Sequence, residues 1–171
     1  MIPVFPVRPT SLSYSYVMAR GGRIVTVGNS YRGDDGVGPY VFSRLSEALP
    51  GVDLVASDGE VSGLIAAFQG CDELLLIDAV DAVGAGLCPG SVIWLEANDP
   101  ALADVGLRAS THAMGVAEAI ALARSLGSLP DRFTVIAIAG ACFGQGQGLS
   151  ADVMAAVDRL VAELSGRYGH A

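Results

Sequence analysis

From residue 23 onward, short continuous apolar runs alternate with segments in which apolar residues recur every three or four positions. The continuous runs predict buried strands, and the recurring pattern predicts helices that each bury one face. The expected strands cover residues 23–27, 53–57, 73–78, 91–96 and 132–138. The expected helices cover residues 37–49, 61–68 and 114–126, and a last helix begins with Ser150 as its N-cap.

Strands that are apolar throughout, rather than at alternate positions, are typical of a parallel sheet covered on both faces. The pattern therefore predicts an α/β fold, a three-layer α/β/α sandwich with a mostly parallel central sheet. The strand at 91–96 has no obvious helix before it, so we expect it to be antiparallel or to lie at an edge. Because no repeat or linker interrupts the pattern, residues 22–166 are expected to form a single domain.

The first 21 residues differ in composition from the rest of the chain. They contain three prolines and several serines, and they lack acidic residues. Two interpretations remain open: this segment is a flexible N-terminal arm, or translation starts at Met18 and the segment is an over-extended start. At the other end, residues 167–171 are expected to form a short tail.

The composition narrows the range of functions. The chain has 171 residues, of which 51% are hydrophobic and 16% charged, and this excludes disorder as the dominant state. Its formal charge of −8, without a cluster of basic residues, argues against nucleic acid or a membrane surface as a partner. The three cysteines form no paired motif, and neither a signal peptide nor a membrane-spanning run is recognisable, so we expect a cytoplasmic protein.

Polar residues follow several of the expected strands. Open parallel sheets bind ligands beyond the carboxyl ends of their strands, so these positions are candidates for a site. Asp35 follows the first strand, Asp78 ends the third, and His112 precedes the third helix. Each also has a purely structural explanation: Asp34 or Asp35 as a helix cap, Asp78 as a solvated strand end, and His112 as a residue at a helix start.

Asp35, Asp78 and His112 are expected at the same edge of the sheet, despite their wide separation in sequence. Two carboxylates and an imidazole suit a borderline divalent cation such as nickel or zinc. The same groups could instead activate a water molecule for amide hydrolysis. Other chemistries lack their motifs: the loop after the first strand has neither the P-loop ending nor the dinucleotide-binding glycine spacing, and no serine-hydrolase elbow occurs.

Five segments of the chain resemble one enzyme family, in the order that the family has them. They are VGNSYRGDDGVGPYV from Val27, DGEVSG from Asp58, LLLIDAVDAVGAGLCPG from Leu74, STHAMGVAEAIALA from Ser110 and GQGQGLSADVMAAV from Gly144. The family is that of the nickel–iron hydrogenase maturation endopeptidases. The resemblance extends over nearly everything after residue 23.

The resemblance implies an α/β enzyme that removes a C-terminal extension from the precursor of the hydrogenase large subunit after nickel has been inserted. It implies that Asp35, Asp78 and His112 recognise the metal and take part in cleavage, by an aspartic-type or a metal-assisted mechanism. The nickel would then come with the substrate rather than being permanently bound. Asn29 and the turn at Asp58 and Gly59 match further motif positions and are expected to line the substrate cleft.

One position departs from the family pattern, because some relatives carry a glutamate in the segment 138–140, where this chain has Ala139. This leaves open an alternative function, a nickel-sensing chaperone or binding module that binds the same precursor without cleaving it. A further alternative is a small-molecule hydrolase or a nucleoside-processing enzyme on a similar sheet, although no base- or phosphate-binding motif supports it.

Overall fold

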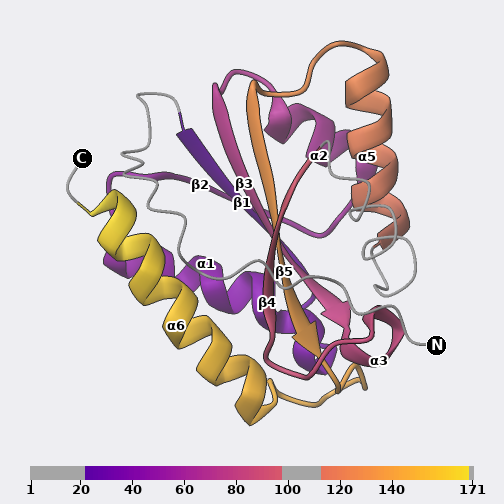
Figure 1. Cartoon of the computed structure of the whole chain (residues 1–171), viewed down its shortest axis with the longest axis vertical. Helices are drawn as coiled ribbons and strands as arrows, with labels where there is room; N and C mark the ends of the chain where they lie inside the picture. Colours follow the sequence, from indigo (N-terminus) through magenta and orange to yellow (C-terminus); the bar gives the residue numbers. More distant parts are fainter. Residues whose placement is uncertain (1–21, 98–112, 170–171) are drawn as a thin grey trace.

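A five-stranded sheet with the order β2-β1-β3-β5-β4 forms the centre of the protein, with helices on both faces (Figure 1). The computed structural model describes residues 22–97 and 113–169. The strands are β1 (Gly22–Val27), β2 (Asp53–Ser57), β3 (Glu73–Asp81), β4 (Val92–Glu96) and β5 (Arg132–Gly140). The helices are η1 (Gly33–Gly36, a 3-10 helix), α1 (Val37–Ala48), α2 (Val61–Phe68), α3 (Ala82–Ala85), α5 (Ala113–Ser125) and α6 (Ala151–Tyr168).

The expected three-layer α/β/α architecture is confirmed. β1 is parallel to both β2 and β3, and β3 is parallel to β5. β4 runs antiparallel to β5 at one edge of the sheet, as expected from the lack of an obvious helical pattern before it. The chain passes from β1 to β2 on one side and then returns to β3 on the other, so the carboxyl ends of β1 and β3 flank the crevice where such sheets bind ligands.

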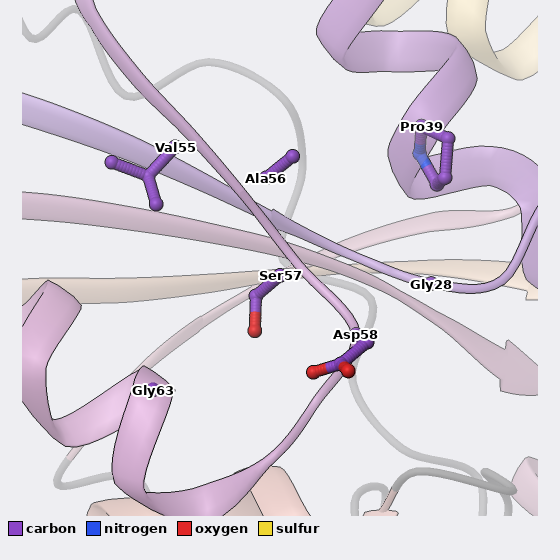
Figure 2. A pocket seen from close by; sticks show the side chains of 7 residues that line it. All are labelled: Gly28, Pro39, Val55, Ala56, Ser57, Asp58 and Gly63. Carbon is purple, nitrogen blue, oxygen red and sulfur yellow. The ribbon is translucent and has the colours of Figure 1, made fainter.

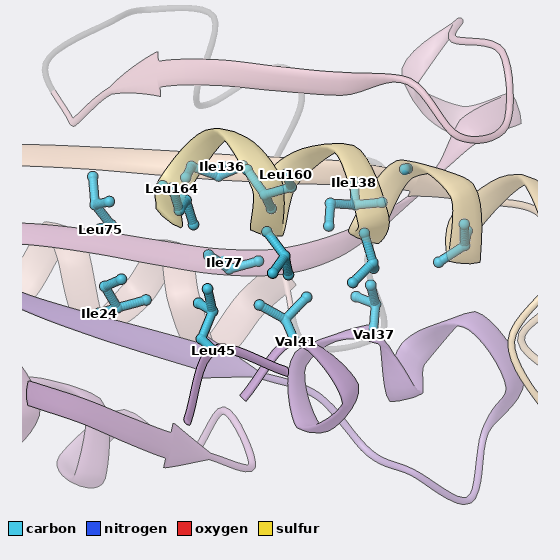
Figure 3. Close-up of a cluster of buried hydrophobic side chains, with 14 of the residues drawn as sticks. Ile24, Val37, Val41, Leu45, Leu75, Ile77, Ile136, Ile138, Leu160 and Leu164 are labelled. Carbon is cyan, nitrogen blue, oxygen red and sulfur yellow. The ribbon is translucent and has the colours of Figure 1, made fainter. Parts of the chain in front are cut away.

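The continuous apolar character of the strands is explained by cores on both faces of the sheet. In β3, Leu75 and Ile77 face the cluster that α1 and α6 complete, which Figure 3 shows. Their neighbours Leu74 and Leu76 face the cluster formed with α2 and α5. All four side chains are at most 3% exposed. A strand buried in this way cannot alternate apolar and polar residues.

β3 and β5 are longer than the sequence predicted. Their ladder continues past Asp78, which pairs with Ala137, to the pair of Asp81 and Gly140. Small and β-branched residues, among them Ala79 and Ala139, permit this extension, but the aspartate within β3 looked like the end of a strand. Two short helices, η1 and α3, were not expected.

The last helix also runs further than expected. Arg167 and Tyr168 belong to α6 rather than to a tail, and the Tyr168 side chain is only 4% exposed against the core. The expected N-terminal arm, residues 1–21, lies outside the described residues. In the part of the chain that the structure describes, no helix is both long and apolar enough to cross a membrane.

Candidate functional site

The loop after β1 folds back tightly and places Asp35 at the carboxyl edge of the sheet. The Asn29 amide donates to the Asp35 carbonyl at 3.0 Å. A Cβ atom on Gly28, whose φ is +157°, would lie 2.1 Å from the same carbonyl oxygen, so only glycine permits this approach. The Asp35 side chain is 1% exposed. The backbone immediately after β1 therefore determines the position of this carboxylate.

Asp34, the neighbouring residue, has a different task. Its carboxylate is 0% exposed and accepts hydrogen bonds from the amides of Ala141, Cys142 and Ser150 at 2.8, 2.9 and 2.7 Å. The Ser150 hydroxyl donates to it as well, at 3.1 Å. Burial by itself would raise the pKa of Asp34, but these donors outweigh it and hold that pKa below its usual range.

Asp34 therefore binds the loop between β5 and α6 to the segment that carries Asp35. The interpretation of either aspartate as a helix cap is wrong, because the N-cap of η1 is Arg32 and that of α1 is Gly36. Ser150 does precede α6 as its N-cap residue, as expected, but its hydroxyl donates to Asp34 instead of capping the helix.

Asp78 lies inside β3 and is 5% exposed, so the interpretation of a solvated strand end is wrong. One Oδ atom accepts from the amide of Ala79 at 2.8 Å. In the ladder with β1, the residue before Asp78 pairs with Thr26, which places Asp78 level with the end of β1. Because η1 packs against β3, the segments that carry Asp35 and Asp78 are in contact.

The third member of the expected set, His112, lies outside the described residues. α5 begins at the next position, and its Gly115 approaches the β2–α2 turn so closely that a Cβ atom there would lie 2.2 Å from the Gly59 carbonyl oxygen. Within residues 22–97 and 113–169, no group of three or more His, Cys, Asp or Glu side chains could hold a metal ion. The described carboxylates, Asp35 and Asp78, supply hard oxygen donors suited to a divalent cation.

The expected substrate-binding residues lie at the carboxyl ends of β1 and β2. Asn29 accepts from the Tyr31 amide at 3.0 Å, and Asp58 accepts from the Glu60 amide at 3.1 Å. Gly59 has a φ of +88° and donates to the Ser57 hydroxyl at 3.1 Å. These contacts confirm the expected turn.

An open pocket of about 510 Å³ lies beside that turn (Figure 2). It is lined by Gly28, Pro39, Val55, Ala56, Ser57, Asp58 and Gly63. Of the expected residues, Asp58 lines it, whereas Asn29 and Gly59 only shape the adjoining backbone. Ser57, Pro39 and Gly63 were not expected at the pocket, because nothing in their local sequence marks them as facing a hollow.

Two other polar features were not anticipated. The Glu60 carboxylate caps α2 by accepting a hydrogen bond from the Gly63 amide at 3.0 Å. The hydrogen bond from the Ser62 hydroxyl, and to a smaller extent the one from the Gly63 amide, lower the pKa of Glu60. Asp81 caps α3 by accepting from the amides of Val83 and Gly84 at 3.3 and 3.1 Å. In both cases an acidic residue just before a short helix was the available signal.

Comparisons with known proteins identify a family and several relatives of this chain. The family model described as hydrogenase maturation protease matches residues 42–166, a range that includes Asp58, Asp78 and His112. The chain is 29% identical over 117 residues to the hydrogenase expression/formation protein HupD of Rhodobacter capsulatus. That match covers 66% of this chain and 54% of HupD, so the chain spans about half the length of this relative.

Solved structures share the fold. The hydrogenase maturating endopeptidase HybD from E. coli is 21% identical with a TM-score of 0.69, covering 84% of this chain and 89% of HybD. A hydrogenase 3 maturation protease is 26% identical with a TM-score of 0.65, covering 90% of this chain and 93% of the other.

Proposed function

This chain belongs to the hydrogenase maturation protease family, and we propose that it removes a C-terminal extension from the nickel-loaded precursor of a hydrogenase large subunit. The observation that carries the proposal is the placement of Asp35 and Asp78, two aspartates at most 5% exposed, on η1 and β3, which are in contact near the carboxyl end of β1. This is the crevice where open parallel sheets bind their ligands.

In the proposed reaction, Asp35, Asp78 and His112 contact the nickel of the substrate and thereby orient the scissile amide. The nickel is part of the substrate and not a resident cofactor. One carboxylate takes a proton from the attacking water as the water oxygen bonds to the carbonyl carbon, and the same carboxyl group then gives that proton to the leaving amine nitrogen as the C–N bond breaks. Aspartic-type and metal-assisted cleavage use the same residues, and they differ in whether the metal polarises the carbonyl.

The decisive experiment follows the mass of the precursor during incubation with wild type, Asp35→Asn or His112→Ala. Asp131→Asn is the matched control, because Asp131 is exposed and immediately precedes β5. It therefore lies at the amino end of that strand, away from the candidate site at the carboxyl ends. Each site variant is expected to process the precursor at least about 100-fold more slowly, and the control at the wild-type rate. Full processing by either site variant would refute the proposed roles.

The alternative of a non-cleaving nickel-sensing module predicts a complex with the precursor and no product. Ala139, the feature that favoured it, is 0% exposed in an apolar cluster with Val80, Ala137 and Leu95. A glutamate at this position would be buried among these side chains at a large cost in free energy. The alanine is therefore explained by packing, and it does not favour loss of cleavage.

The proposal places the protein in the cytoplasm, where the large-subunit precursor would meet it. The three cysteines support a reducing compartment, since Cys71, Cys88 and Cys142 are free thiols. The acidic composition leaves nucleic acid outside the proposed partners.

A further inference from the structure

The outer edge of β2 is open in the part of the chain that the structure describes. Among residues 22–97 and 113–169, β2 pairs with β1 alone and stands at the end of the sheet. An edge of this kind presents backbone N–H and C=O groups that can bind a further strand. Which of these groups are available follows from the ladder with β1.

The hydrogen-bond ladder with β1 shows which residues of β2 point their backbone N–H and C=O groups away from β1. The Gly28 amide donates to the Ser57 carbonyl at 3.2 Å, so the polar backbone groups of Ser57 face β1. In a parallel pair this direction alternates from one residue to the next. The groups of Val55 therefore also face β1, and those of Leu54 and Ala56 face the open side.

The pocket of Figure 2 lies at the carboxyl end of this edge. Its lining alternates along the strand: Val55 and Ser57 share one face of β2, while Ala56 lies on the other. Because residues from both faces of β2 line the pocket, the pocket runs along the open edge of this strand. Gly28 forms one wall and packs closely on the Asp35 carbonyl, so this wall of the hollow adjoins the loop that carries Asp35.

The charge at this end of β2 is negative. Asp58 alone is charged among the described residues that line the pocket, and the exposed Glu60 lies two residues further on. Figure 2 shows the Asp58 carboxylate on the same side of β2 as the Ser57 hydroxyl, toward Gly63. A basic side chain is the complement of this surface.

We propose that the precursor segment around the cleavage site binds as an added strand along β2, with a basic side chain beside Asp58. The inference rests on the proposed function, because its occupant is the substrate of that reaction. Leu54 and Ala56 exchange main-chain hydrogen bonds with the added strand, in the manner of β-augmentation. The strand then extends from the edge of β2 past Gly28 to Asp35, where an extended amide becomes accessible to attack.

Backbone amide exchange tests the added strand directly. The full chain, labelled with ¹⁵N, is titrated with a synthetic peptide that contains the extension and the residues before the cleavage site. The amides of Leu54 and Ala56 should become about tenfold more protected, whereas Val55 and Ser57, already bonded to β1, should not change. These alternate residues are matched controls within one strand.

Other results would overturn the inference. Uniform protection of all four amides, or none, would exclude an added strand. Slow exchange of Leu54 and Ala56 without peptide would show that this chain covers its own edge. Protection that rises with protein concentration would show instead that a second copy does so. None of these outcomes depends on cleavage, so they are distinct from a failure of the proposed function, in which wild type leaves the precursor intact.

A second measurement tests the basic side chain. Asp58→Asn keeps the oxygen that accepts from Glu60, so the turn is retained while the charge is lost. With a precursor that has a basic residue near the cleavage site, the variant should raise KM about tenfold and leave kcat unchanged. With that residue replaced by glutamine, the variant should have no effect on KM. An equal rise in KM for both precursors would refute the assignment.

Discussion

The two ends of the sheet hold their carboxylates in different ways. At the amino end, Asp53 pairs with Arg23 at 2.8 Å and Glu73 pairs with Arg132 at 3.2 Å. At the carboxyl end, the Asp34 carboxylate is fully buried and accepts hydrogen bonds from three backbone amides and one hydroxyl. The amino end therefore relies on opposite charges, and the carboxyl end relies on backbone donors in fixed positions.

This difference shows which end of the sheet tolerates change. The Arg23–Asp53 pair lies at the surface and contributes little, because water and salt screen it and long side chains must be ordered to form it. A carboxylate that accepts from several backbone amides cannot be replaced without leaving those amides without their acceptor. Backbone hydrogen bonds to Asp34 thus hold the carboxyl end of the sheet in place, and Asp35 and Asp78 lie at this end.

The largest effect is expected from Asp34→Ala. The change leaves the amides of Ala141, Cys142 and Ser150 without their acceptor, so the free energy of unfolding should fall by about 3–4 kcal/mol. Urea unfolding measures this loss. Precursor processing should fall with it, because Asp34 joins the β5–α6 loop to the segment that carries Asp35.

The control at the amino end is Asp53→Asn. Asp53 has a side chain that is 51% exposed, and Arg23 retains its hydrogen bonds to the carbonyls of Ala67 and Gln69. We expect a loss below about 1 kcal/mol. If both variants lost the same stability, the contrast between the two ends would be wrong.

Two glycines in helices sharpen the comparison by steric means. A Cβ atom on Gly38 of α1 would lie 2.1 Å from the Val27 carbonyl oxygen, where the start of α1 packs on the end of β1. Gly38→Ala should therefore destabilise the protein by about 2–3 kcal/mol. Gly166 of α6 has no heavy atom within 4 Å of such a Cβ, so Gly166→Ala should stabilise by about 0.5–1 kcal/mol. If packing is tighter at the carboxyl end, the midpoint temperature of thermal unfolding should fall for Gly38→Ala and rise for Gly166→Ala.

The last effect concerns the titration of Tyr168 near the amino end of the sheet. Burial, followed by the charge of Glu73, raises the pKa of Tyr168 to about 12. In the unfolded chain the pKa is about 10, so between about pH 10 and 12 the unfolded state loses a proton that the folded state keeps. Stability should be unaffected by this group below about pH 10 and then fall by roughly 2 kcal/mol as the pH rises.

Tyr168→Phe provides the control for this titration. The chain contains no lysine, so no lysine side chain ionises in the same range. Urea unfolding of both proteins across this range should show a smaller fall for the phenylalanine variant. An identical fall in the two proteins would mean that Tyr168 is not the group that titrates.

The layers and the order of elements could be predicted because burial on both faces imposes continuous apolar strands. The lengths of β3 and β5 could not, because Asp78 interrupts the apolar run although its backbone continues the ladder with Ala137. Likewise η1 and α3 are too short to show periodicity. Local patterns report which residues are buried, whereas the end of a strand depends on its neighbour in the sheet.

The candidate site, too, could be predicted only in part. Topology alone places Asp35 and Asp78 at one edge, since β1 and β3 are parallel neighbours. The sequence does not distinguish Asp34 from Asp35, because they are adjacent and identical. The donors that bind Asp34 lie 107 to 116 positions away, so only the folded chain separates the two residues.

The sequence by itself therefore determined the architecture, the family resemblance and the set of candidate residues, because periodicity and motifs are local properties of a chain. Tertiary structure alone decided which aspartate holds the β5–α6 loop, where the pocket opens and which backbone groups of β2 face outward. These depend on contacts between distant segments and on the phase of a hydrogen-bond ladder, and the amino-acid order does not display either of them.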